Sequence, residues 1–295
     1  MTSPGRATRG NIIVGVDGSP SSELAVIWAA TEARLQHRGL TLVHARKVVS
    51  ANELAWLSAA GIPPRQIYDH IWGDAEQIVD RAHSLAAERC PDASIERVID
   101  TGDPRNVLLE LGSTASMTVV GTRGHGRVAG LLLGSVSGVL VRHAEGPLVV
   151  VRHAPGSAEG ILVASDGSDE SKPVVEHAYR EASWRQVPLT VVHCLWDGLI
   201  ATSRWITLST TDPAGESARL RVAETLAGMA EKFPEVEANI QVTRGAIDAC
   251  LVDLSARHEL LVIGRPSRPR LVRLTLSGLT TPVVEHAHSP VLVVP

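Results

Sequence analysis

A glycine-rich stretch from Gly121 to Ser137, G-T-R-G-H-G-R-V-A-G-L-L-L-G-S-V-S, holds the residues with the clearest potential for chemistry. It follows a short apolar run, Met117 to Val120, and a helix is predicted to begin at Gly134. Glycine lets the backbone take positive φ and lie close against a ligand. Free N–H groups at a helix start attract anions. The stretch therefore predicts a loop that binds the phosphates of a polyphosphate.

The residues assigned to such a ligand are small, carry a free N–H or a hydroxyl, or are basic. They are Gly121, Thr122, Arg123, Gly124, His125, Gly126, Arg127, Gly134, Ser135, Val136 and Ser137. Glycine-rich turns between strand and helix also arise for purely geometric reasons. The basic side chains have an alternative too, since many loop charges are simply solvated.

Two better-known phosphate motifs are absent from the chain. A P-loop needs a lysine directly after its last glycine, and the lysines here are Lys47, Lys172 and Lys232, all far from the loop. A Rossmann fingerprint needs G-x-G-x-x-G after the first strand, whereas Gly130 comes one residue too late. The histidines show no H-E-x-x-H spacing, and no G-x-S-x-G elbow occurs. No catalytic or metal-binding residue is assigned.

A second candidate is the end of the first predicted strand, N-I-I-V-G-V-D, with Gly15 and Asp17. In open α/β sheets, ligands bind beyond the carboxyl ends of the strands, where the strand order reverses. A carboxylate beside phosphates is unfavourable unless it faces a hydroxyl. We therefore expect Asp17 to face the ribose or the adenine edge. Its alternative role is to start the turn and help cap the first helix.

Strand-like apolar runs alternate with helical periodicity along the first half. Strands are predicted at 11–17, 40–45, 95–101, 117–120 and 147–151, and helices at about 20–39, 73–90, 104–111 and 134–144. The pattern is lost between residues 46 and 72, where an excursion with a short helix is expected. Such alternation predicts an α/β domain with a mostly parallel sheet.

The second half repeats the first. Asp166 and His193 lie 149 positions after Asp17 and His44, whereas Gly264 and Pro290 lie 143 positions after Gly121 and Pro147. A tandem repeat with one net deletion explains both offsets. The first strand is predicted within 160–168, which lines up with residues 11–19. Further strands are predicted at 187–194, 236–243, 259–263 and 290–294, and helices at 216–233, 246–258 and 277–288. The expected fold is two Rossmann-like α/β domains, residues 1–153 and 160–295, each a five-stranded, mostly parallel sheet with helices on both faces.

The spacing G-x2-G-x9-G-S, from Gly121 to Ser135, resembles the nucleotide loop of the universal stress protein family in its ATP-binding branch. The resemblance covers nearly the whole chain, twice. It implies that the first domain binds ATP, with or without Mg²⁺. Gly15 and Asp17 would line the adenosine side, the backbone of Ala45 would meet adenine, and the loop would hold the phosphates.

The second copy departs from this pattern. Ala164, Asp166 and Gly264 are kept, but Ser267 replaces the second glycine and Ser277-Gly278 inverts the Gly-Ser pair. Prolines in this loop also remove N–H donors. The loop is degenerate, and binding there is expected to be weak or lost, unless its arginines compensate by formal charge.

The expected function is therefore regulatory: an ATP-binding universal stress protein that controls a stress response or growth through nucleotide-dependent conformation or interaction. A nucleotide-free structural or interaction module is the first alternative. A slow ATP-hydrolysing or nucleotidyl-transfer enzyme is the second, and fast hydrolysis is not predicted because no lysine or general base is placed at the phosphates.

Composition limits the partners. The net charge of −4 and pI near 6.3 do not favour nucleic acid. No apolar stretch reaches the length of a membrane span. Three scattered cysteines, with no C-x-x-C pair, are typical of a reducing compartment, so a cytoplasmic location is expected. The apolar last strand of each half, 147–151 and 290–294, would be an exposed sheet edge unless it pairs. The resemblance implies that these strands pair, either between the two halves or across a homodimer. A regulatory protein partner of unknown identity is also expected.

Overall fold

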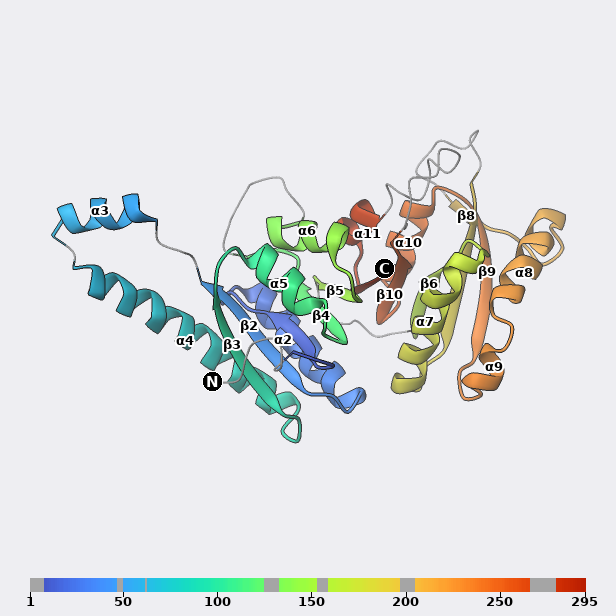
Figure 1. Ribbon diagram of the computed structural model, residues 1–295. Helices are drawn as coiled ribbons and strands as arrows, with labels where there is room; N and C mark the ends of the chain where they lie inside the picture. Colours follow the sequence, from blue (N-terminus) through green and yellow to red (C-terminus); the bar gives the residue numbers. More distant parts are fainter. Residues whose placement is uncertain are drawn as a thin grey trace. The chain divides into compact units, whose positions relative to one another are not determined.

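The computed structural model describes residues 8–46, 50–61, 63–124, 133–152, 159–196, 205–265 and 280–295. The chain divides into two compact units, Met1–Gly146 and Pro147–Pro295. Both are α/β in architecture, as Figure 1 shows, which confirms the predicted fold class. None of the helices in these ranges combines the length and the apolar character that a bilayer crossing demands.

The first unit is built on a parallel sheet in the order β3-β2-β1-β4. The strands are β1 (Ile12–Gly15), β2 (Leu40–Arg46), β3 (Ile95–Thr101) and β4 (Met117–Gly121). Helix α2 (Pro20–Leu35) packs beside α4 (Pro64–Arg89), and α5 (Pro104–Gly112) beside α6 (Ser135–His143). Both faces of the sheet are thereby covered. This explains why β1 is an unbroken apolar run with Ile12, Ile13 and Val14 fully buried.

Helix α4 is longer than its periodicity predicts. It begins at Pro64 rather than near residue 73, so the prediction for this boundary was wrong. Proline suits the first turn of a helix because the missing N–H would be unpaired there. Pro63 and Pro64 interrupt the apolar pattern in the sequence, but in the structure they are the N-cap and the first residue of α4. The predicted short helix is α3 (Ala51–Ala59), held by a capping box between Ser50 and Glu53.

The second unit repeats the arrangement in the order β5-β11-β10-β6-β7-β9-β8. Its strands are β5 (Leu148–Val151), β6 (Ile161–Ala164), β7 (Leu189–Leu195), β8 (Trp205–Thr207), β9 (Ala238–Gly245), β10 (Leu260–Gly264) and β11 (Val291–Val294). Its helices are α7 (Lys172–Arg185), α8 (Pro213–Thr225), α9 (Met229–Lys232), α10 (Ile247–Ser255) and α11 (Thr280–His286), with a 3-10 turn, η1, at Asp169–Ser171. Strands β11, β10, β6, β7 and β9 are parallel.

Three details differ from the pattern. Edge strand β8, antiparallel to β9, is only three residues long and gave no periodic signal. The helix predicted at 216–233 is broken into α8 and α9 at Gly228, which has φ of 80°. Strand β5, assigned by the repeat to the first domain, pairs antiparallel with β11 and falls in the second unit. The two apolar last strands therefore pair with one another.

Candidate nucleotide site

The candidate site lies at the carboxyl edge of the first sheet, where the strand order reverses. Strand β1 is flanked by β2 on one side and β4 on the other, and Val14 is in register with Val119. The chain leaves β1 toward α2 and leaves β4 toward α6. The connections that follow β1 and β4 thus lead away from this point, where the strand order reverses, and open α/β sheets bind ligands at such points. The ends of β1 and β4 carry the two predicted motifs.

The turn after β1 uses Asp17 as an internal acceptor. Its Oδ1 accepts the backbone N–H of Ser19 at 3.0 Å, and Gly18 takes φ of 79°. Ser19, rather than Asp17, caps α2, since its Oγ accepts from the N–H of Ser22 at 3.2 Å. The other carboxylate oxygen of Asp17 faces the glycine loop: a Cβ placed on Gly124 would lie 2.1 Å from Oδ2.

Two glycines lie close to neighbouring segments where the loop leaves β4. A Cβ on Gly121 would lie 2.6 Å from the carbonyl oxygen of Ser21 in the first turn of α2, and backbone cannot easily move away, so this position requires glycine. At Gly124 a Cβ would meet the Asp17 carboxylate, which would have to rotate away. The loop therefore packs closely against the start of α2 and against the Asp17 side chain.

Serines at the start of α2 join that helix to the loop. The Ser19 hydroxyl donates to the Arg123 carbonyl at 3.3 Å, and the N–H of Arg123 donates to Ser21 Oγ at 3.4 Å. The hydroxyls of Ser21 and Thr122 lie 3.4 Å apart. Sequence reasoning missed these serines, although the cluster G-S-P-S-S after Asp17 was a visible signal. They fix the loop to the start of α2, close to the end of β1.

The other end of the loop closes on its beginning. The carbonyl of Thr122 accepts from the N–H of Gly134 at 2.7 Å and from the hydroxyl of Ser137 at 2.9 Å. Ser137 is buried, so its hydroxyl holds the base of the loop instead of facing solvent. Ser135, the first residue of α6, is exposed, and the N-cap residue Gly134 provides no side-chain cap. The first N–H groups of α6, including those of Ser135 and Val136, are thus suited to an anion.

Of the remaining predicted residues in the first unit, Gly15 ends β1 and packs against Leu108, and Ala45 lies near the end of β2 in register with Asp100. His125, Gly126 and Arg127 lie outside the described residues. The described part of the chain contains no group of three or more His, Cys, Asp or Glu residues that could hold a metal ion.

His44 and His193 make equivalent contacts in the two units. His44 Nδ1 lies 2.7 Å from the Val16 carbonyl, and His193 Nδ1 lies 2.9 Å from the Ser165 carbonyl. Each ring therefore ties the end of its second strand to the turn after the first strand. Burial lowers the pKa of His193, opposed by the hydrogen bond to the Ser165 carbonyl. The contacts support a structural role for both rings.

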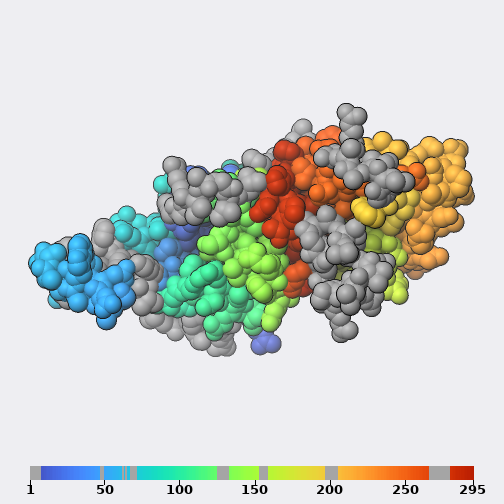
Figure 2. Space-filling model, turned by 90° about the horizontal axis from the view of Figure 1, so that it is seen from above, coloured from blue at the N-terminus to red at the C-terminus, as the bar shows by residue number. Residues whose placement is uncertain are grey.

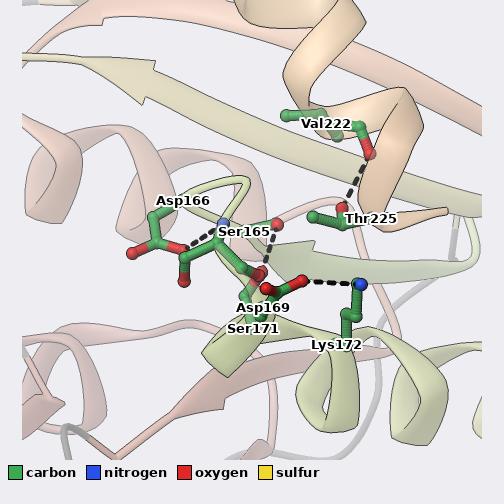
Figure 3. Close-up of polar contacts among 8 residues, drawn as sticks. Ser165, Asp166, Asp169, Ser171, Lys172, Val222 and Thr225 are labelled. Carbon is green, nitrogen blue, oxygen red and sulfur yellow. Dashed lines mark hydrogen bonds and ion pairs between the residues drawn. The ribbon is translucent and has the colours of Figure 1, made fainter.

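The equivalent edge of the second unit is arranged differently (Figure 3). Asp166, beyond Ala164 at the end of β6, accepts on Oδ1 both the N–H of Ser168, at 3.0 Å, and its hydroxyl, at 2.6 Å. Helix α8 comes close: a Cβ on Gly167 would lie 3.5 to 3.6 Å from Cβ and backbone atoms of Arg221. A helix of the unit itself thus lies against this turn.

Gly264, which ends β10, matches Gly121 in sequence but not in surroundings. A Cβ on Gly264 would meet a methyl group of Val174 at 2.9 Å, whereas Gly121 faces the backbone of Ser21. A methyl group can shift where backbone cannot. The rest of the second loop, including Ser267 and Ser277-Gly278, lies outside the described residues.

Comparison with known proteins gives the family of the chain. A model of the universal stress protein family matches the chain twice, at residues 8–152 and 159–295. The chain belongs to the universal stress protein family. A universal stress protein of Mycobacterium tuberculosis is 34% identical over 302 residues, covering 96% of each chain. One from Mycolicibacterium smegmatis is 31% identical, covering 98% of each.

Solved structures show the same fold. The crystal structure of a universal stress protein from Archaeoglobus fulgidus matches with a TM-score of 0.68 and 16% identity, covering 97% of this chain and 96% of that one. At this identity the likeness concerns the fold alone. The tandem arrangement of two universal stress protein domains is thus present both in the sequence matches and in a solved structure.

Proposed function

We propose that the first unit binds an adenine nucleotide, ATP foremost, in the crevice between the ends of β1 and β4. The observation that carries this proposal is the approach of Gly124 to Asp17, where a Cβ would lie 2.1 Å from the carboxylate. A loop that fits a strand end so closely, next to an uncapped helix start, supports a preformed cradle for phosphates.

Different residues would bind the phosphates and the ribose of the nucleotide. Backbone N–H groups of the loop at Gly124 and of α6 at Ser135 and Val136 would hold the phosphates. The Asp17 carboxylate would accept a hydroxyl of the ribose. Mg²⁺, where present, would be bound chiefly by the phosphates, since no carboxylate cluster occurs among the described residues. With no described lysine or general base placed at the loop, turnover would be slow.

The second unit is proposed to be a scaffold that binds nucleotide weakly or not at all. Two observations favour this second role. The Ser168 hydroxyl donates to Asp166 Oδ1, whereas the corresponding hydroxyl of Ser19 donates to the loop carbonyl of Arg123. Helix α8 also lies against Gly167. The expected stoichiometry is therefore one ATP per chain. Binding of the nucleotide would change the conformation of the loop and of an interaction surface, and would thereby act on a regulatory partner. The protein is further proposed to be cytoplasmic and to assemble as a homodimer.

The test is a calorimetric titration of ATP into nucleotide-stripped protein, alongside Gly124→Ala and Gly73→Ala. Gly73 lies in α4, and a Cβ there meets nothing within 4 Å, so it is a matched control. We expect one site per chain, at least about tenfold weaker in Gly124→Ala and unchanged in Gly73→Ala. Two equal sites would refute the scaffold role of the second unit. The absence of any site would refute nucleotide binding in favour of an interaction module.

A further inference from the structure

A cation–aromatic pair lies at the same edge of the first unit. Arg46 is the last residue of β2, in register with Thr101 of β3. Its guanidinium carbon lies 3.7 Å from the ring centroid of Trp72, which belongs to the N-terminal half of α4. That half of the helix extends past the sheet (Figure 1). Strand β2 is the neighbour of β1, so the pair lies on the strand-two side of the crevice.

Arg46 is held by the indole ring. Its Nε is buried and finds no hydrogen-bond partner among the described residues. A guanidinium within about 6 Å of an indole face is attracted to it, and the two planar groups stack well. A buried donor without an acceptor is unfavourable and needs an explanation.

Trp72 keeps part of its surface free. The residue is 40% exposed although the guanidinium lies over its ring. An indole with a cation held over its ring is a rigid, flat surface, and Arg46 at the end of β2 places it next to the strand that leads to Asp17. Aromatic side chains of this kind are the usual partners of nucleic-acid bases, because every base offers a π face.

We propose that the Arg46–Trp72 pair is the platform on which the base of the bound nucleotide stacks. This inference rests on the proposed function and adds a specific determinant to it. Since stacking tolerates any base, the platform contributes affinity for nucleosides over bare phosphate chains rather than choice among bases. Arg46 acts as a positioning residue, because it fixes the ring and leaves the contact to Trp72.

The chain supplies a matched control in Trp56. This residue lies in α3, which stands out from the sheet at the blue extremity of the first unit (Figure 2), and is 72% exposed. Its removal takes away a similar exposed indole from the neighbouring helix. A general effect of losing surface tryptophan would therefore appear in both variants, whereas base stacking concerns Trp72 alone.

The experiment measures the affinity for ATP and for inorganic tripolyphosphate, which has no base, by calorimetry. It uses the full chain and the variants Trp72→Ala, Trp72→Phe and Trp56→Ala, each checked for folding by thermal melting. We expect Trp72→Ala to weaken ATP roughly 5- to 100-fold and to leave tripolyphosphate unchanged. Trp72→Phe should recover most of the loss, and Trp56→Ala should match the wild type.

Two results would overturn the platform while leaving the proposed function intact. One is an ATP affinity of Trp72→Ala within twofold of the wild type. The other is an equal loss for ATP and tripolyphosphate, which would mean that the substitution disturbs the phosphate loop. Failure of the wild type to bind ATP would instead overturn both proposals, so the two failures are distinguishable.

Discussion

At the scale of single residues, several side chains of the candidate site form hydrogen bonds within the protein and hold the loop in place, rather than facing a ligand. Ser137 is the clearest example, because its buried hydroxyl donates to Thr122, the carbonyl that also receives the N–H of Gly134. Ser135, two positions earlier, is exposed. The two serines are alike in type and lie close together in sequence, and burial alone gives Ser137 a structural role while Ser135 stays accessible to the proposed ligand.

This difference makes a pair of substitutions informative. Ser137→Ala should lower the free energy of unfolding by about 1 kcal/mol, because a buried hydrogen bond to a backbone carbonyl is lost. It should also weaken ATP binding by loosening the loop base. Ser135→Ala should leave stability within about 0.5 kcal/mol. Urea denaturation of both variants is the measurement, and equal stability losses would contradict the clasp.

His193 gives a prediction about pH. Burial lowers its pKa, Arg221 lowers it further, and Asp166 and the Ser165 carbonyl oppose the shift. The folded state therefore resists protonation that the unfolded state accepts below about pH 6.5. By linkage, this stability is fully present above that pH and is lost as the pH falls from there through the lower pKa of the folded state.

The test compares denaturation midpoints between pH 7.5 and 5.5. His193→Gln should show a shallower loss on acidification than the wild type. Part of the loss should remain, since burial also lowers the pKa of His177. His286→Gln, an exposed control, should keep the wild-type slope. A slope unchanged in His193→Gln would exclude this residue as the source.

At the scale of elements, the start of α2 both begins a helix and holds the loop. Ser19 accepts from Ser22 and donates to Arg123. Asp212 caps α8 in the second unit, accepting from Ala214 and Gly215 at 2.9 and 3.0 Å. Ser19→Ala and Asp212→Ala should each cost about 1 kcal/mol of stability. Only Ser19→Ala should also reduce ATP affinity; a loss in both would show that helix stability, not the loop contact, governs binding.

Most elements were predictable because each carries its own pattern. The central parallel strands β1, β4, β6 and β10 are buried on both faces, so they read as unbroken apolar runs, and the repeat allowed the pattern to be read twice. The start of α4 was missed because Pro63 and Pro64 were read as breaking the pattern, whereas proline suits the first turn of a helix. Strand β8 was missed because three residues carry no period. The break at Gly228 depends on one positive φ that periodicity cannot register.

The site was predictable in its backbone parts and not in its side-chain parts. Gly121, Gly124 and Gly134 follow a spacing that the sequence displays. The contact between Arg46 and Trp72 joins residues 26 positions apart on different elements, and no local pattern reports it. Likewise, the sequence shows that the second loop is degenerate, but it does not show that α8 lies against the turn at Gly167.

At the scale of the whole molecule, two repeats of one fold are proposed to have separate tasks, and ATP should reveal this. A ligand that binds only the folded first unit stabilises it by about 2.7 kcal/mol at 100 times its dissociation constant. Amide exchange that requires opening of that unit should slow about 100-fold there. We expect the effect in β1, β4 and α6 and not in β6 and β10, as followed by hydrogen-exchange mass spectrometry. Gly124→Ala should abolish it. Equal slowing in both units, with one ATP bound per chain, would show instead that the repeats open together, and the division of tasks would then have to lie in binding alone.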